Sequence, residues 1–309
     1  MKNIKEFKKL FKINIPVEEH FDYYIDVLSE SKEYENIKDL VSEYEKYEIH
    51  CEDAGFKSSK SYKLDHALPL LVSHIKQTSA YNSLMEEDFS NAGFRTKDTL
   101  KDNDNTYLMS IDFSSANYSA LKTYDKDNEL FESWDELCEK KHIHPVLAKS
   151  KSFRQFVFGN TSPKRLQRHQ HRNIVKITNE LIDFYGFVED DFVFISHDEF
   201  VVKLRPDHKL AVSRFIKLIH SVDEIINKLD IGMKVHSRVY KNEAIDKKMS
   251  VQTMYNVKMG GLSESHLVLH QVPRDKYFKI FKKYILKESI DTRDLLFVNN
   301  GDLAIWVND

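Results

Sequence analysis

The stretch FVFISHDEFVVKL, residues 192–204, constrains the fold of this chain more than any other segment. Two short runs of apolar and β-branched residues flank a polar His-Asp-Glu triplet, a pattern that predicts a buried β-hairpin with the triplet at its tip. Hairpin tips usually carry Gly, Asn or a single Asp. Two adjacent carboxylates at such a tip repel each other unless a cation lies against them. The segment therefore predicts both a hairpin and a site that attracts positive charge.

The elements around this hairpin predict an α+β fold. The segment TYLMSIDF, residues 106–113, is typical of a buried strand, and Asp112 lies at its end. After it we expect, in chain order, a helix that starts at Ser162-Pro163 and stops at Gly186, the hairpin, a helix over residues 208–229 and a strand over 233–240. The order strand, helix, hairpin, helix, strand is that of the ferredoxin-like, or split βαβ, arrangement.

The 309 residues divide into three predicted parts. Helical spacing of apolar residues predicts a mainly helical N-terminal domain over residues 1–104. The strand, helix and hairpin pattern occupies residues 105–240, and residues 241–309 form a mixed α/β C-terminal segment. The two cysteines belong to no CxxC pattern, which fits a reducing compartment and supplies no zinc-finger ligands. Without a signal-peptide pattern or a long apolar run, we expect a cytoplasmic protein with no membrane partner.

Charge is distributed unevenly along the chain, although the formal net charge is only −3. Residues 1–104 carry 15 Lys and Arg against 21 Asp and Glu, whereas residues 140–179 carry ten Lys and Arg and no acidic residue. Signs usually alternate on a surface that merely faces water. The basic strip over 140–179 therefore predicts a surface that binds a polyanion, with a plain solvated face as the alternative.

Three carboxylates in this layout favour metal-dependent chemistry. If the strand over 106–113 lies beside the hairpin, Asp112, Asp198 and Glu199 project at the same end of the sheet. Carboxylates a few Å apart raise each other's pKa and are stabilised by cations. Mg²⁺ prefers carboxylate oxygens together with phosphate oxygens, and two such ions about 4 Å apart stabilise an in-line phosphoryl displacement. Taken alone, Asp112 could instead have a purely structural role, as a turn former or a helix cap.

Three segments resemble motifs of the DNA polymerase I family and the related single-subunit phage-type RNA polymerases. YLMSIDFSSANYSALK, residues 107–122, resembles motif A, and SHDEFVV, residues 196–202, resembles motif C of the DNA-synthesising branch. KSFRQFVFGNTSPKRLQ, residues 151–167, is more loosely similar to motif B, in which a basic residue precedes an aromatic-Gly pair. More distantly, the Gly159 to Pro163 stretch and the two-acid hairpin are similar to reverse transcriptase motifs.

This resemblance implies a ferredoxin-like polymerase palm with a helical N-terminal domain and abbreviated fingers. Asp112 and Asp198 would bind two Mg²⁺ or Mn²⁺ ions, and Glu199 would support the site from its edge. Lys151 or Arg154 would contact the triphosphate, and Phe158 would stack near the base or sugar. The residues expected to contact nucleic acid are Lys164, Arg165, Arg168 and Arg172.

The activity implied is template-directed transfer of a nucleotide to a 3′-hydroxyl. The enzyme would act in the cytoplasm, or in the host cell if it is encoded by a virus or phage. Template, primer and nucleoside triphosphates would be its partners, together with other subunits if the polymerase is split. Asn117 stands where the DNA branch has a sugar-discriminating Glu, so the sequence leaves the choice between dNTP and NTP open. Two alternatives also stay open: a non-catalytic nucleic-acid-binding subunit with a degenerate palm, and a nucleotide cyclase.

Overall fold

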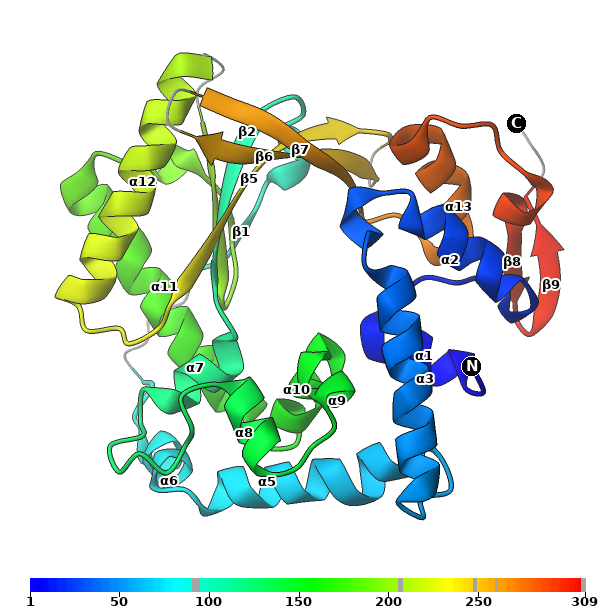
Figure 1. Cartoon of the computed structure of the whole chain (residues 1–309). Helices are drawn as coiled ribbons and strands as arrows, with labels where there is room; N and C mark the ends of the chain where they lie inside the picture. The colour runs from blue at the N-terminus through cyan, green and yellow to red at the C-terminus, as the bar shows by residue number, and fades with distance from the viewer. Residues whose placement is uncertain (91–94, 205–207, 247–248, 259–260, 307–309) are drawn as a thin grey trace.

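The structure is a computed structural model that describes residues 1–90, 95–204, 208–246, 249–258 and 261–306. A seven-stranded antiparallel sheet carries two long helices on one face, which confirms the predicted α+β class (Figure 1). The first helices of the chain, within residues 4–53, lie together with the C-terminal segment on the other side of the molecule in that view. Within the described ranges, none of the helices combines the length and the apolar character needed to traverse a bilayer.

The sheet has the strand order β1-β3-β4-β2-β5-β6-β7. Its strands are β1 (Lys97–Asp98), β2 (Tyr107–Phe113), β3 (Phe192–Ile195), β4 (Glu199–Lys203), β5 (Val235–Ala244), β6 (Ser250–Lys258) and β7 (Gly261–His270). Helix α11 (Pro163–Tyr185) leads from the β2 side of the chain to the β3–β4 hairpin, and α12 (His208–Lys228) leads from the hairpin to β5. The predicted order of strand, helix, hairpin, helix and strand is confirmed.

The two faces of β2 have different surroundings because side chains alternate along a strand. Met109 and Ile111 face the main hydrophobic core, which also contains Ile174 and Ile177 of α11. On the opposite face, Leu108 joins a small separate cluster with Tyr240 and other residues. Asp112 has the same parity as Leu108 and so lies on this second face, away from α11 and α12.

Helix α11 begins and ends where the sequence predicts. Ser162 precedes Pro163 at the first helical position, and the chain leaves the helix at Gly186. Gly186 has a φ of 74°, and its N–H donates to the carbonyl of Leu181. This left-handed cap favours Gly, which has no Cβ to clash with the backbone. The helix is thereby fixed in length, and its buried residues pack against the sheet.

The remaining elements are mainly helical up to residue 90 and mixed after residue 270. The N-terminal part contains α1 (Ile4–Phe11), α2 (Phe21–Ser29), α3 (Ile37–Asp53), α4 (Ser59–Ser61), a π-helical turn (Tyr62–Ala67), α5 (Leu68–Gln77) and α6 (Ser79–Glu86). Between β2 and α11 lie α7 (Ala116–Lys122), α8 (Trp134–Lys140), α9 (Pro145–Lys149) and α10 (Lys151–Gly159). The C-terminal part contains α13 (Tyr277–Ile280), a π-helical turn (Phe281–Leu286), β8 (Leu296–Asn299) and β9 (Asp302–Ile305).

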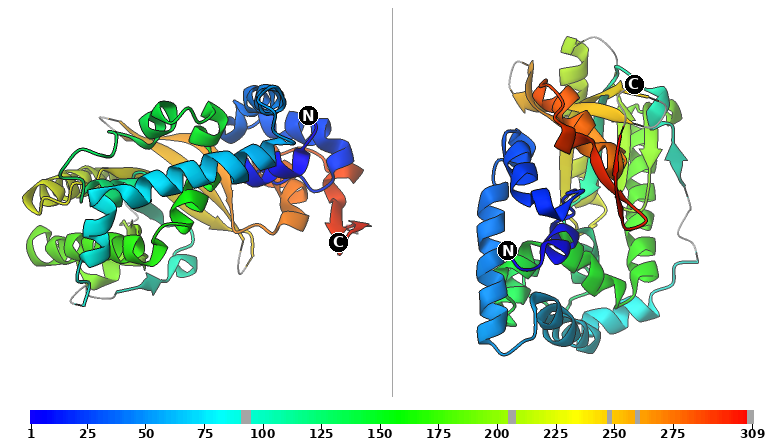
Figure 2. Two further views of the ribbon diagram at one scale, coloured as in Figure 1. Left: turned by 90° about the horizontal axis from the view of Figure 1, so that it is seen from below. Right: turned by 90° about the vertical axis from the view of Figure 1, so that its right-hand side faces the viewer.

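The two ends of the chain pack against each other through aromatic residues. The Tyr24 hydroxyl donates to the carbonyl of Arg293 at 2.7 Å, and the Tyr24 and Phe278 ring centroids lie 4.3 Å apart. Tyr23 donates to Asp294 Oδ1, also at 2.7 Å. Figure 2 shows the first helices beside the C-terminal strands in both further views. The segments expected as 1–104 and 241–309 therefore share a core, and one buried cluster extends from Phe7 to Phe281.

Candidate active site

The register of the sheet places Asp112 of β2 directly opposite Glu199 of β4. Opposed residues of an antiparallel pair point to the same face, so these two carboxylates are neighbours. Their side chains are 27% and 28% exposed, which leaves both open to a ligand. Ser110, fully buried on the same face, donates its hydroxyl to Glu199 Oε1 at 2.5 Å. A charge-assisted bond of this kind fixes the direction of the Glu199 side chain.

Asp198 is attached to the same end of β2 through the backbone. The Phe113 N–H donates to the Asp198 carbonyl at 2.9 Å, which joins the hairpin tip to the strand that carries Asp112. Burial, together with the negative charges of Asp198 and Glu199, raises the pKa of Asp112 to about 6. Asp112 and Glu199 are thus neighbours across the two strands, and the backbone of Asp198 is joined to the same end of β2.

Two cations act on this group of carboxylates. Arg238 of β5 places its Nη2 atom 3.9 Å from Asp112 Oδ2 and 3.9 Å from Glu199 Oε1. The positive charges of Arg238 and Lys151 both lower the pKa of Asp112, against the larger opposite effects of burial and the neighbouring acids. Lys151 is exposed at the first position of α10. The strand carrying the carboxylates therefore faces positive charge from β5 and from α10.

A buried histidine holds the hairpin in place from α11. His171 Nδ1 lies 3.2 Å from the Ser196 carbonyl, and its Nε2 accepts the Arg95 N–H at 3.0 Å. Because Nε2 accepts, Nδ1 carries the hydrogen and donates to Ser196. Burial and the nearby charge of His197 lower the pKa of His171, which keeps this neutral form. The neutral imidazole positions the residue that starts the turn at the hairpin tip.

The residues expected to contact the nucleotide fall in different environments. Lys151 is the one that acts electrostatically on Asp112, whereas the half-buried Arg154 interacts with the charge of Asp135. Phe158 is 1% exposed and packs against Trp134 with ring centroids 5.8 Å apart. Phe158 therefore presents no open face for stacking on a base, and its place in this structure is in the core. Lys151 is the better candidate for the triphosphate contact.

Half of the expected nucleic-acid-binding cations on α11 are engaged inside the molecule. Arg165 donates from Nε to the Leu84 carbonyl at 2.8 Å, and Arg172 pairs with Glu87 at 2.6 Å. Both guanidinium groups also lie over the ring of Phe89. Lys164 and Arg168 are exposed on the same helix. Arg165 and Arg172 thus hold the end of α6, which leaves Lys164 and Arg168 as the cations of this set that face solvent.

The donor set at Asp112 fits a divalent cation by its chemistry. Carboxylate oxygens are the ligands that Mg²⁺ and Mn²⁺ prefer, and a bound cation would neutralise the repulsion that raises the pKa of Asp112. Asp112 and Asp198 would hold the ion, with Glu199 at the edge. In the described part of the chain, no three His, Cys, Asp or Glu side chains are gathered into a metal-binding group.

Comparisons with known proteins add no relationship to this picture: no model of a protein family matches the chain, and no curated protein matches its sequence.

Three residues of the site escaped the sequence interpretation: Arg238, Ser110 and His171. The sequence does contain a signal for Arg238. Residues 235–240, VHSRVY, place His236 and Arg238 at alternate positions of a predicted strand, so both lie on one face. The register then puts His236 opposite Asp112, and Arg238 opposite Ser110. A polar pair on a strand beside the expected carboxylate strand is the pattern that points to the site.

Proposed function

We propose that this chain is a template-directed nucleic-acid polymerase that transfers a nucleotide to a 3′-hydroxyl. The observation that carries the proposal is the in-register pair of Asp112 and Glu199, with Asp198 attached to the same strand end. Asp112 and Glu199 are far apart in the sequence, yet they are paired on a sheet face that α11 and α12 leave uncovered. The raised pKa of Asp112 is typical of carboxylates grouped at a functional site.

The strand connections support a palm of the ferredoxin-like type. The path β2, α11, β3, β4, α12, β5 and the spatial order β3-β4-β2-β5 support this proposal, because they agree with a split βαβ arrangement. In this arrangement, β3 follows the first crossover helix and turns back into β4, which pairs with β2. The end of β2 and the hairpin tip then meet, as nucleotidyl transfer by paired carboxylates requires. The short helices α7 to α10, between β2 and α11, would take the place of abbreviated fingers.

Each residue has a defined task in this proposal. Asp112 and Asp198 would hold two Mg²⁺ or Mn²⁺ ions, which when bound stabilise the attacking and leaving oxygens of an in-line displacement. Glu199, fixed by Ser110, would keep the edge of the site negative. Lys151 would bind the triphosphate. The primer 3′-hydroxyl attacks the α-phosphate, the bond to the β-phosphate oxygen breaks, and pyrophosphate leaves.

Arg238 favours a second candidate, a nucleic-acid-binding subunit with a degenerate palm. A guanidinium 3.9 Å from both Asp112 and Glu199 supplies positive charge where a catalytic ion would otherwise act. With this guanidinium beside them, Asp112 and Glu199 can stay ionised next to each other without a bound metal ion. The exposed Lys164 and Arg168 would then carry the nucleic-acid binding. The two candidates differ in a single measurable property, which is metal-dependent incorporation of nucleotides.

The test is primer extension with purified protein in Mg²⁺ or Mn²⁺, on DNA and RNA templates, with dNTPs and NTPs supplied separately. Asp198→Ala should lower extension by about 100-fold or more, the scale of losing one stabiliser of transition-state charge. Asp183→Ala, at an exposed acid on α11, is the matched control and should extend normally. Extension that survives in Asp198→Ala overturns the mechanism. Salt-sensitive binding in EDTA without any extension supports the binding subunit instead.

A further inference from the structure

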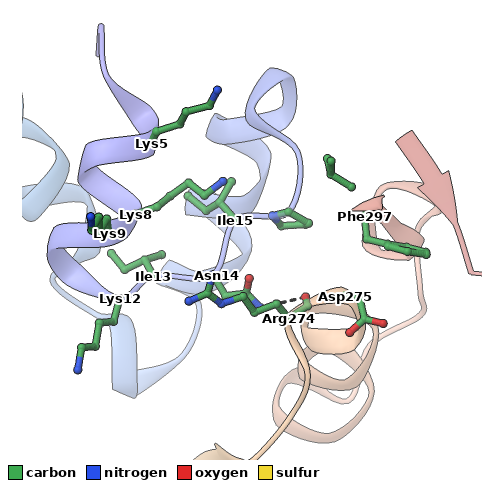
Figure 3. A pocket seen from close by; sticks show the side chains of 12 residues that line it. Lys5, Lys8, Lys9, Lys12, Ile13, Asn14, Ile15, Arg274, Asp275 and Phe297 are labelled. Atoms are coloured by element: carbon green, nitrogen blue, oxygen red, sulfur yellow. Dashed lines mark hydrogen bonds between the residues drawn. The ribbon is translucent and has the colours of Figure 1, made fainter. Parts of the chain in front are cut away.

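A cleft far from the carboxylates in sequence separates α1 from the C-terminal segment (Figure 3). Its volume is about 610 Å³. Basic residues dominate its lining, and an aromatic residue closes one side: Lys5, Lys8, Lys9, Lys12, Arg274 and Phe297. In Figure 3, Lys5 and Lys8 extend from the helix on one side, and Phe297 lies on the other. In Figure 1, α1 and β8 lie on the other side of the view from β2 and β5.

The cleft has fixed walls. Phe7 and Leu10 bury the apolar side of α1 in the core, so the lysines of this helix are left on its outer side. The Asn14 side-chain amide donates to the Arg274 carbonyl at 3.0 Å, which joins the segment after α1 to the turn before α13. The cations of the cleft therefore come from two parts of the chain that are held together across 260 positions of sequence.

The charges of this cleft are unfavourable without a ligand. Lys5 and Lys9 stand four residues apart on α1, a spacing at which like charges destabilise a helix. Lys8 has a partner in Glu18 at 3.3 Å, whereas Lys5 and Lys9 are exposed. Among the lining residues, Asp275 is the single acid against five cations. An excess of this kind in a concave site concentrates anions.

An ordered aromatic stack forms the facing wall. Phe297 lines the cleft and stacks on Trp306, with ring centroids 5.2 Å apart and planes inclined by 24°. Trp306 is held by a hydrogen bond from its Nε1 to the Asp275 carbonyl at 2.8 Å, and Lys276 lies over its ring. The Phe297 ring is thus supported from behind, with one side at the cleft. A supported aromatic beside a basic groove is how proteins bind the bases and phosphates of single strands.

We infer that the cleft between α1 and β8 binds single-stranded nucleic acid, with phosphates on Lys5, Lys9 and Arg274 and a base against Phe297. Aromatic stacking and a row of cations together fit a nucleotide chain better than an inorganic anion or an acidic peptide, neither of which offers a flat base. This site does not depend on the catalytic proposal, since binding there needs neither Asp112 nor a metal ion.

The test is fluorescence anisotropy of a labelled 20-nucleotide single strand, as DNA and as RNA, in EDTA. All variants carry Lys164→Gln and Arg168→Gln, so that the exposed cations of α11 do not contribute. Adding Lys5→Gln and Lys9→Gln should weaken binding about tenfold and reduce the salt slope by roughly 1.4, the value for two lost phosphate contacts on a single strand. Phe297→Leu should weaken binding about fivefold with an unchanged slope, as expected for lost stacking.

Two comparisons make the result decisive. Lys57→Gln with Lys76→Gln removes the same charge from exposed positions elsewhere in the N-terminal part, and should leave binding unchanged. Equal weakening by both double variants would overturn the inference, because general electrostatics would then explain binding. A Phe297→Leu protein with native circular dichroism and undiminished affinity would also overturn it, as would equal competition by polyglutamate.

Discussion

Arg238 Nη2 lies 3.9 Å from Asp112 Oδ2, and the strand register explains why. Arg238 is paired with Ser110 across β2 and β5, so Asp112 is its diagonal neighbour on the same face. Diagonal neighbours are within reach only of long side chains, a condition that Arg meets. With 47% of its side chain exposed, Arg238 gains little stability from such a distance. Its effect is on the charge of the site.

Replacing Arg238 by Gln should strengthen binding of Mn²⁺ by about two- to fivefold. Removing a cation beside the carboxylates lowers the repulsion that a divalent ion meets, by up to about 1 kcal/mol at a solvent-exposed site. The measurement is Mn²⁺ titration followed by electron paramagnetic resonance at pH 8, above the pKa of Asp112 near 6. Arg238→Lys keeps the charge and serves as the control. Unchanged affinity in Arg238→Gln would show that the guanidinium does not compete with metal.

Ser110→Ala should destabilise the protein through Glu199. The buried hydroxyl of Ser110 donates to Glu199 Oε1 at 2.5 Å, and hydrogen bonds to charged groups contribute about 1.5–3 kcal/mol. Because Glu199 is partly exposed and can turn to water, we expect a loss of about 1 kcal/mol in urea unfolding. A double-mutant cycle with Glu199→Ala isolates the pair. Additive effects of the two substitutions would contradict the coupling that we predict.

His171→Phe should loosen the hairpin tip. The substitution keeps the ring volume but removes the bonds to the Ser196 carbonyl and from the Arg95 N–H, at about 2 kcal/mol together. Hydrogen exchange should accelerate at residues 196–200, and nucleotide incorporation should fall with it. His171→Gln, which retains a donor and an acceptor, should recover part of both. Unchanged exchange at the tip in His171→Phe would mean that other contacts position the hairpin.

Local sequence signals predicted the elements that build the site. The two β-branched runs around residues 196–198 and the Ser-Pro and Gly186 boundaries of α11 are encoded within a few residues, so their prediction needed no tertiary information. The grouping of Asp112 with the hairpin acids followed from element order alone. Strand β6 was not predicted, although Val251, Tyr255 and Val257 alternate with polar residues along it and face the core.

Long-range pairing decided what the sequence did not show. Arg165 and Arg172 belong to an acid-free stretch, yet their partners, the Leu84 carbonyl and Glu87, lie about 80 positions earlier. Phe158 stands at a motif-like spacing, but helical periodicity alone does not say whether its face meets solvent or core. Arg238 became a site residue only through the register of β2 and β5. Local patterns predict whether a segment is a helix or a strand, but they do not show which distant residues its side chains will contact.

Lowering the pH should destabilise the protein partly through His169. Its Nε2 accepts from Asn173 at 3.1 Å, its Nδ1 bonds the Tyr124 hydroxyl at 2.8 Å, and burial with the charge of Arg172 lowers its pKa from 6.5 to about 4. Between these values the unfolded chain binds a proton that the folded chain does not, so the free energy of unfolding falls as pH drops. From pH 7.5 to 5 the loss through this residue is about 2 kcal/mol. Urea unfolding of His169→Gln should show a pH dependence weaker by that amount, whereas His220→Gln, at an exposed position of α12, serves as the control. A His169→Gln protein with the full pH dependence of the parent would assign the acid sensitivity to other groups.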